Sequence, residues 1–213
     1  MDRRPLKTRS RPTAAALAAA LRRRGVRPNH ISLAGVAFAL LTAGAFIALP
    51  YASAPLQAAV LVAAAAGIQL RLACNLLDGL LAVEGKLASP TGELYNDVPD
   101  RFADLLILVP AGYAIAWDWG GPLGWAAAAA ALLTAYVRVL GGALGARQHF
   151  VGPMAKPHRM AVLTAACLLS LVELAAADFE GRIVAIALAV ILAGSLVTFT
   201  RRLRLVAQEL NAR

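Results

Sequence analysis

The chain has 213 residues, of which 60% are hydrophobic, with a formal net charge of +9 and a mean hydropathy of +0.66. This balance excludes an ordinary soluble domain, in which apolar and polar residues are about equally frequent. The basic residues flank apolar segments and form no patch interleaved with aromatic side chains, so we expect anionic lipid headgroups and phosphate-bearing substrates as partners and no nucleic acid.

The N-terminal segment, residues 1–26, places a short apolar stretch between basic residues. This stretch, Ala14 to Leu21, runs into Arg22, Arg23 and Arg24 and not into a small-residue cleavage site, which argues against a removed signal peptide. We predict a helix that lies on the cytoplasmic surface of a membrane. It would precede a six-helix transmembrane core over 27–204, so that residues 1–213 form a single membrane domain.

Six apolar stretches follow, each close to the length of about 20 residues that a helix needs to cross the hydrocarbon core. The predicted fold is therefore all-α, a polytopic membrane protein with six transmembrane helices. The predicted spans are at about 30–50, 55–82, 94–117, 122–146, 159–177 and 183–200.

The connections on the two sides of these spans differ in charge. Those near 50–55, 117–122 and 177–181 contain acidic residues and no Lys or Arg, apart from Arg182 at one edge. Most Lys and Arg residues lie on the other side. The positive-inside rule makes that side, and both termini, cytoplasmic.

Small residues recur within the spans, including the pair Gly141 and Gly145. Such small-xxx-small pairs let two helices approach closely. Packing within the subunit and contact across a homodimer suit this pair equally well.

Polar residues gather where the second predicted span meets the cytoplasmic side. At 1.5 Å per residue, a span of about 30 Å that starts at Leu56 ends near residue 76. Asn75 and Asp78 thus lie at the membrane boundary, about one helical turn apart on a shared face. Carboxylates at this depth are costly unless they pair or bind cations, which indicates a functional site.

A second polar series follows in the third predicted span. Asn96, Asp100 and Asp104 recur every four residues, which aligns them on one face if the helix continues through Pro99. Oxygen ligands on two neighbouring helices suit Mg²⁺ or Mn²⁺ better than zinc.

A purely structural role is the alternative for these acids. Asp78 and Asp100 can pair with Arg71 or Arg101, and Asp97 and Asp104 have the stronger expectation of a salt bridge or a helix cap.

The stretch from Asn75 to Asp100 resembles the signature of the CDP-alcohol phosphotransferase family, D-x2-D-G-x2-A-R-x8-G-x3-D-x3-D, with every spacing matched. The identical positions are Asp78, Gly79, Ala82, Gly92 and Asp100. Asn75 and Asn96 are amides of the expected acid, and Val83 replaces the expected arginine. Residues 27–32 are also similar to the start of the family's first span, which carries a Pro-Asn-x-x-Ser/Thr pattern.

The resemblance implies an enzyme of phospholipid synthesis that depends on Mg²⁺ or Mn²⁺. An alcohol acceptor would attack the β-phosphorus of a CDP-linked lipid or alcohol donor, and CMP would leave. The implied metal ligands are Asn75, Asp78, Asn96 and Asp100. Asp100 would also take the alcohol proton as the catalytic base.

The resemblance also implies substrate contacts. Those for the CDP-linked donor are Gly79, Ala82 and Gly92, with Arg71 or Lys86 in place of the missing motif arginine. Those for the acceptor are Arg138, Lys156 and Arg159, because 136–138 and 156–159 look like the basic stretches that the family places around its acceptor.

The two amides leave two carboxylates to offset the two dications that the resemblance implies. We therefore expect metal binding to depend on the nucleotide more than is usual for the family. Two alternatives stay open: a weakened relative that binds CDP-lipid without turnover, and a small transporter that uses Asp78 and Asp100 as an ion site. Metal-dependent release of CMP distinguishes the enzyme from both.

Overall fold

The computed structural model describes residues 12–84 and 91–212, without the side chains of 12, 83, 84, 93, 95 and 96. Its regular elements are α1 Pro12–Arg23, α2 Pro28–Ala48, the short 3-10 helix η2 Leu49–Tyr51, α3 Ala54–Glu84, α4 Gly92–Tyr113, α5 Gly120–Ala143, α6 Lys156–Ala176 and α7 Arg182–Asn211. Every regular element in the described part is helical. The prediction of an all-α fold is confirmed.

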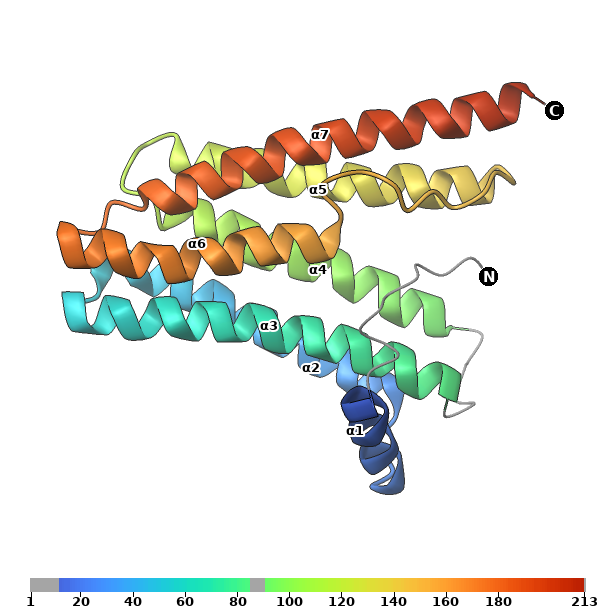
Figure 1. Ribbon diagram of the computed structural model, residues 1–213, viewed down its shortest axis with the longest axis horizontal. Helices are drawn as coiled ribbons and strands as arrows, with labels where there is room; N and C mark the ends of the chain where they lie inside the picture. Colours follow the sequence, from blue (N-terminus) through green and yellow to red (C-terminus); the bar gives the residue numbers. More distant parts are fainter. Residues whose placement is uncertain (1–11, 85–90, 213) are drawn as a thin grey trace.

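Helices α2 to α7 lie side by side along one axis and form a bundle (Figure 1). Helix α2 packs on α3 and α4, α5 packs on α4 and α7, and α6 packs on α3 and α7, so the six helices close a ring. Large buried side chains from the helices fill its interior, among them Phe46, Ile68, Ile107, Leu163 and Leu188. The ring fixes which helices can share a site.

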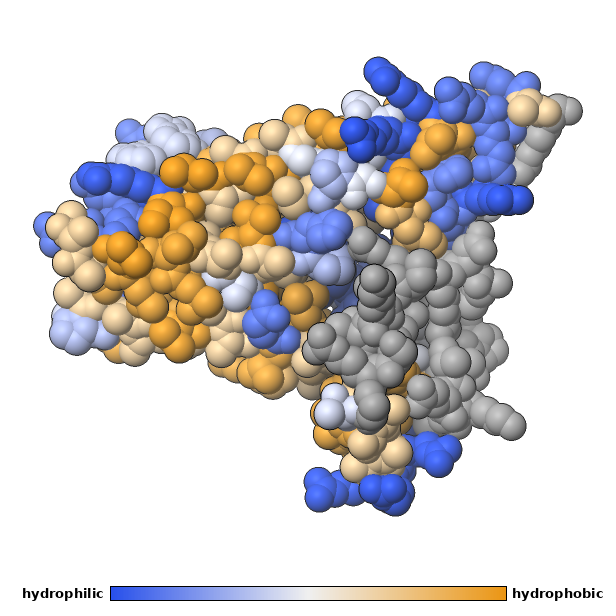
Figure 2. All heavy atoms as spheres, in the orientation of Figure 1, coloured by the Kyte–Doolittle hydropathy of each residue, from blue (hydrophilic) through white to orange (hydrophobic). Residues whose placement is uncertain are grey.

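Over the residues that the structure describes, five of these helices are long and apolar enough to cross a membrane, namely α2, α3, α5, α6 and α7. Large apolar side chains such as Leu33, Val172 and Ile186 are exposed on the bundle, and Figure 2 shows an apolar surface over much of it. A surface of this kind is stable in lipid and not in water. The chain is an integral membrane protein.

Helix α4 is the exception among the six predicted spans. It carries Asp97, Asp100, Arg101 and Asp104 within eight consecutive residues, and it is not among the helices that are apolar enough to cross a membrane over their described residues. It nevertheless runs along the bundle between α2 and α5, and its charged residues pair with basic side chains. The count of six spans stays a prediction.

Helix α7 continues well beyond the predicted end of its span at residue 200, to Asn211. Arg202 is buried in this extension and donates hydrogen bonds to the backbone oxygens of Val151, at 2.9 Å, and Thr134, at 2.6 Å. These bonds hold the polar end of α7 along α5. The hydrophilic residues of this end are visible in Figure 2.

The predicted N-terminal helix is present as α1, and it lies across the bundle and not along it (Figure 1). Its buried Ala18 belongs to a small apolar cluster with Ile31, Cys74, Leu80 and Leu81. This cluster docks α1 at the end of α3 that carries the polar residues. Its location at a membrane surface remains a prediction.

Glycines bring α4 and α5 together. A Cβ added at Gly124 would lie 2.9 Å from the backbone oxygens of Leu108 and Val109, which is closer than real side chains approach. Gly141 faces Val206 of α7 within the same chain. The two possibilities for the Gly141 and Gly145 pair were packing within the subunit and contact across a homodimer. Gly141 packs within the subunit.

Candidate active site

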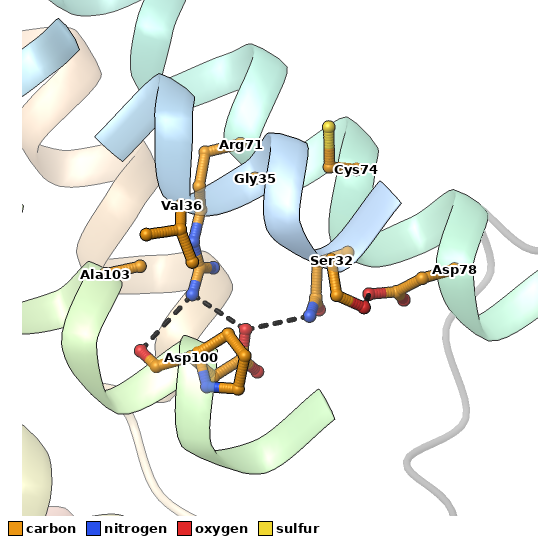
Figure 3. Close-up of a pocket in the computed structure, with 10 residues that line it drawn as sticks. Ser32, Gly35, Val36, Arg71, Cys74, Asp78, Asp100 and Ala103 are labelled. Atoms are coloured by element: carbon orange, nitrogen blue, oxygen red, sulfur yellow. Dashed lines mark hydrogen bonds and ion pairs between the residues drawn. The ribbon is translucent and has the colours of Figure 1, made fainter. Parts of the chain in front are cut away.

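A small cavity lies between α2, α3 and α4. Its described lining comprises Ser32, Gly35, Val36, Arg71, Cys74, Asn75, Asp78, Pro99, Asp100 and Ala103 (Figure 3). Helix α4 continues through Pro99, so Asp100 and Asp104 both face into the bundle, as the four-residue spacing predicted. Three of the four predicted metal ligands, Asn75, Asp78 and Asp100, thus line one cavity.

Asp100 is held by three side chains from two other helices. Its Oδ1 accepts hydrogen bonds from Arg71 Nη2, at 2.8 Å, and from Asn75 Nδ2, at 2.9 Å (Figure 3). Its Oδ2 forms an ion pair with Lys156 Nζ at the start of α6. These three contacts hold the Asp100 carboxylate in one orientation.

Asp78 is 4% exposed and has one satisfied and one unsatisfied oxygen. Its Oδ2 accepts a hydrogen bond of 2.8 Å from Ser32 Oγ in the first turns of α2. Within the described part of the chain, its Oδ1 has no hydrogen-bond partner. A buried carboxylate oxygen without a partner is unfavourable, and a bound cation is one way to satisfy it.

The oxygen atoms at the cavity fit a hard divalent cation in their chemistry. Asp78 and Asp100 supply carboxylates and Asn75 a neutral amide, and oxygen donors of this kind suit Mg²⁺ and Mn²⁺. No cluster of three or more His, Cys, Asp or Glu side chains that could hold a metal occurs among the described residues. Asn75, which contributes an amide oxygen to the cavity, is not one of these residue types.

The three basic residues predicted to bind an acceptor form ion pairs with three different carboxylates. Lys156 pairs with Asp100, Arg138 bonds to both oxygens of Asp97 at 3.0 Å, and Arg159 pairs with Asp104 at 2.7 Å. They do not form one basic pocket.

Arg159 is buried inside the bundle, where it pairs with Asp104. Its side chain is 1% exposed and also donates a 3.0 Å hydrogen bond to the backbone oxygen of Met154, while Asp104 is fully buried. This pair joins α4 to the start of α6. Asp104 and Asp97 are salt-bridge residues, as the structural alternative predicted.

Apart from Arg71, the residues predicted to contact the donor lie outside the described lining of the cavity. Gly79 and Ala82 follow Asp78 on α3, and Gly92 is the first residue of α4. Lys86 and the side chain of Asn96 lie outside the described parts of the chain. Arg71 does line the cavity, through a guanidinium whose Nη1 has no hydrogen-bond partner among the described residues.

Ser32 is a site residue that was not predicted. Its signal was present in the Pro-Asn-x-x-Ser pattern, which starts α2 at Pro28 and places Ser32 one turn inside that helix. Only the packing of α2 on α3 shows that its hydroxyl meets Asp78.

Taken together, these elements define a helical membrane protein with a polar cavity between three helices and carboxylates at its centre. No family model matches the chain, and no curated protein matches it. Its fold is similar to that of phosphatidylinositol phosphate synthase from Mycobacterium tuberculosis in two crystal structures.

The first of these structures has CDP-DAG bound and gives a TM-score of 0.71 at 19% sequence identity, over 91% of this chain and 92% of that chain. The second is a complex with manganese and citrate and gives a TM-score of 0.74 at 18% identity, over 91% of this chain and 88% of that chain. The shared fold thus extends over nearly the whole of both proteins.

Proposed function

We propose that this chain is a CDP-alcohol phosphotransferase of phospholipid synthesis, which transfers a phosphatidyl or related phospho-alcohol group from a CDP-linked donor to an alcohol. One observation carries the proposal. The signature residues Asn75, Asp78 and Asp100 come from two helices and line one cavity, in a fold shared with an enzyme whose crystal structure holds CDP-DAG.

The donor's diphosphate is the group that the cavity suits best. Arg71 and Lys156 bring two positive charges to Asp100, and Arg71 Nη1 has no hydrogen-bond partner in the described residues. Guanidinium and ammonium groups are the usual protein ligands of phosphate oxygens. Mg²⁺ or Mn²⁺ held at Asp78 would neutralise the diphosphate and the leaving group when bound.

The transfer forms a bond between the alcohol oxygen and the donor's β-phosphorus. The bond from that phosphorus to the bridging oxygen breaks, and the oxygen leaves with CMP. The alcohol proton passes to Asp100. Arg71 and Asn75 orient this carboxylate through Oδ1, and Oδ2 has lone pairs enough to keep Lys156 and accept the proton.

For the acceptor we propose a position near Arg138. Its guanidinium bonds to Asp97 and, at 2.6 Å, to Gln148 Oε1, and lies 5.4 Å from the centre of the Phe150 ring. Arg138 comes from α5 and Asp97 from α4, the helix that carries Asp100. An anionic alcohol that competes with Asp97 for Arg138 would be held on the Asp100 side of the bundle.

A second candidate is a protein that binds the CDP-linked lipid without turnover. It is favoured by one observation, that both oxygens of Asp100 are already engaged by other side chains. Asp100 can accept a proton in this state only if the side chains bound to it release one of its oxygens or share it with the proton.

The purified protein in detergent, supplied with CDP-diacylglycerol, Mn²⁺ and a panel of neutral and anionic alcohols, tests both candidates. Release of CMP that requires the metal and one of the alcohols supports the transferase. Saturable binding of CDP-diacylglycerol with no CMP from any alcohol supports the binding protein. A preparation treated with a chelator is the control for metal dependence.

A further inference from the structure

The charges at the cavity are balanced by the chain itself. Asp78 and Asp100 are the negative groups in its described lining, and Arg71 and Lys156 are the positive groups that line it or pair with Asp100. Asn75 is neutral. Two negative and two positive formal charges therefore sum to zero before any ligand binds.

This sum limits how many divalent cations the site can take together with its substrate. The diphosphate of a CDP-linked donor carries two negative charges as a diester on each phosphorus, and one dication cancels them. A second dication would leave two positive charges without compensation beside side chains that are largely buried. Uncompensated charge in such a place is strongly unfavourable.

The arrangement of the ligand oxygens agrees with the same limit. Asp100 Oδ1 accepts two hydrogen bonds and Oδ2 is paired with Lys156. Asp78 Oδ1 has no hydrogen-bond partner among the described residues; Asp104 Oδ1 also has none, but Asp104 is not part of the described lining of the cavity. One cation position is therefore open at Asp78, and the corresponding position at Asp100 is filled by an ammonium group.

Lys156 is an unusual residue for its place in α6. It is the first residue of that helix, where the helix dipole disfavours a positive charge. Its side chain is 14% exposed, so the ammonium group is not simply directed to solvent. The ion pair with Asp100 compensates the positive charge of Lys156 at this position.

We propose that the site binds a single divalent cation, at Asp78, and that the Lys156 ammonium group serves as the second positive centre for the donor's diphosphate. This inference rests on the proposed function for the identity of the diphosphate. It explains how a chain with amides at two signature positions keeps a neutral complex with the donor. Lys156 is then a donor-binding residue and not an acceptor-binding one.

The test counts Mn²⁺ bound to the full-length protein in detergent micelles with saturating CDP-diacylglycerol, by electron paramagnetic resonance of the free ion. The wild-type chain is expected to bind about one Mn²⁺. Lys156→Glu removes the ammonium group and adds a carboxylate, so it is expected to bind about two. Lys156→Arg keeps the positive charge and is expected to bind about one.

Arg204→Glu is the matched control, because it makes the same charge change at an exposed position of α7 outside the cavity. It is expected to bind about one Mn²⁺. Each variant is first checked for a single symmetric peak in size-exclusion chromatography. If the Lys156→Glu protein fails this check, the Mn²⁺ counts of the wild type and of Lys156→Arg still test whether the site binds one cation.

Two Mn²⁺ on the wild type or on Lys156→Arg, or none on the wild type, would overturn the proposal. So would an unchanged count in a folded Lys156→Glu protein. CMP release is measured in the same preparations. CMP release by a wild-type protein that binds two Mn²⁺ would contradict the single-cation site and support the transferase. One bound Mn²⁺ without CMP release from any alcohol would support the single-cation site and contradict the transferase.

Discussion

Ser32 Oγ on α2 donates a hydrogen bond of 2.8 Å to Asp78 Oδ2 on α3, between residues 46 positions apart in the chain. The same hydroxyl lies 3.3 Å from the backbone oxygen of Pro28, one turn earlier in α2. The bond fixes one oxygen of Asp78 and leaves the other without a described partner. Ser32 is thus a positioning residue for the carboxylate that we assign to the metal.

Ser32→Ala is expected to weaken metal binding by about 10-fold, because groups that orient a metal ligand typically affect affinity by that factor or more. The measurement is the Mn²⁺ concentration that gives half-maximal CMP release. Ser170→Ala removes a buried hydroxyl of α6 outside the cavity and should leave this concentration unchanged. An unchanged value for Ser32→Ala would mean that Asp78 needs no orientation by α2.

The site could be predicted in part, because helical spacing and membrane depth are both properties of local sequence. They placed Asn75 and Asp78 on one face of α3, and Asp100 and Asp104 on one face of α4. Arg71 was one of the two partners considered for Asp100, and the structure shows that pair, but Lys156 as a second partner could not be predicted. Which basic residue reaches Asp100 depends on the packing of α6 on α3, and Lys156 and Arg159 differ only by one turn of helix.

For the fold too, local sequence predicted the helices but not how they pack. The helices lie where hydropathy predicted spans, since lipid selects apolar residues. Helix α7 continues beyond its predicted span into a segment where Arg202 bonds to the backbone oxygens of Val151 and Thr134. The order of helices around the ring was not predicted. Surfaces that face lipid and surfaces that face another helix are both apolar, so hydropathy does not distinguish them.

The amide at position 75 gives a second prediction. Asn75→Asp together with Asn96→Asp adds negative charge and is expected to tighten Mn²⁺ binding in the absence of nucleotide by about 10-fold, since an added carboxylate attracts a dication at close range. Titration of the free protein with Mn²⁺ measures this. Gln69→Glu is the control, because Gln69 bonds to Thr164 of α6 and not to the cavity. Equal affinity in the double variant and the wild type would show that neither side chain reaches the metal.

Asp100→Asn tests the proposed base. The amide keeps the size of the side chain and one acceptor oxygen but no longer takes a proton, so turnover is expected to fall by at least about 100-fold. Binding of CDP-diacylglycerol, measured in the same preparation, is expected to persist. Asp97→Asn, on the same helix but paired with Arg101 and Arg138, is expected to lose much less turnover. Near-normal turnover in Asp100→Asn would remove Asp100 as the base.

The orientation of the bundle is testable without any assay of activity. A tag at either terminus is expected to be accessible from the cytoplasm, and a tag inserted beside Asp118, between α4 and α5, from the outside. Protease protection in sealed membrane vesicles measures both. A C-terminal tag on the external side would contradict the prediction of six spans, because α7 would then end on the wrong side.

The buried pair of Arg159 and Asp104 separates a structural role from acceptor binding. Arg159→Met leaves Asp104 as an unpaired charge in the bundle, and loss of one partner of a buried pair costs about 3–5 kcal/mol. We expect a clear fall in the melting temperature in detergent. Arg159→Met with Asp104→Leu removes both charges and is expected to recover most of that loss.

Two further measurements complete this test. Arg182→Met breaks an exposed pair with Glu180 and serves as the matched control, with an expected cost of at most about 1 kcal/mol. At a temperature where the Arg159→Met protein stays folded, its KM for the acceptor alcohol is expected to remain within about 2-fold of the wild-type value, because a residue that does not touch the substrate does not change its binding. A large rise in that KM with an unchanged melting temperature would return Arg159 to the acceptor site.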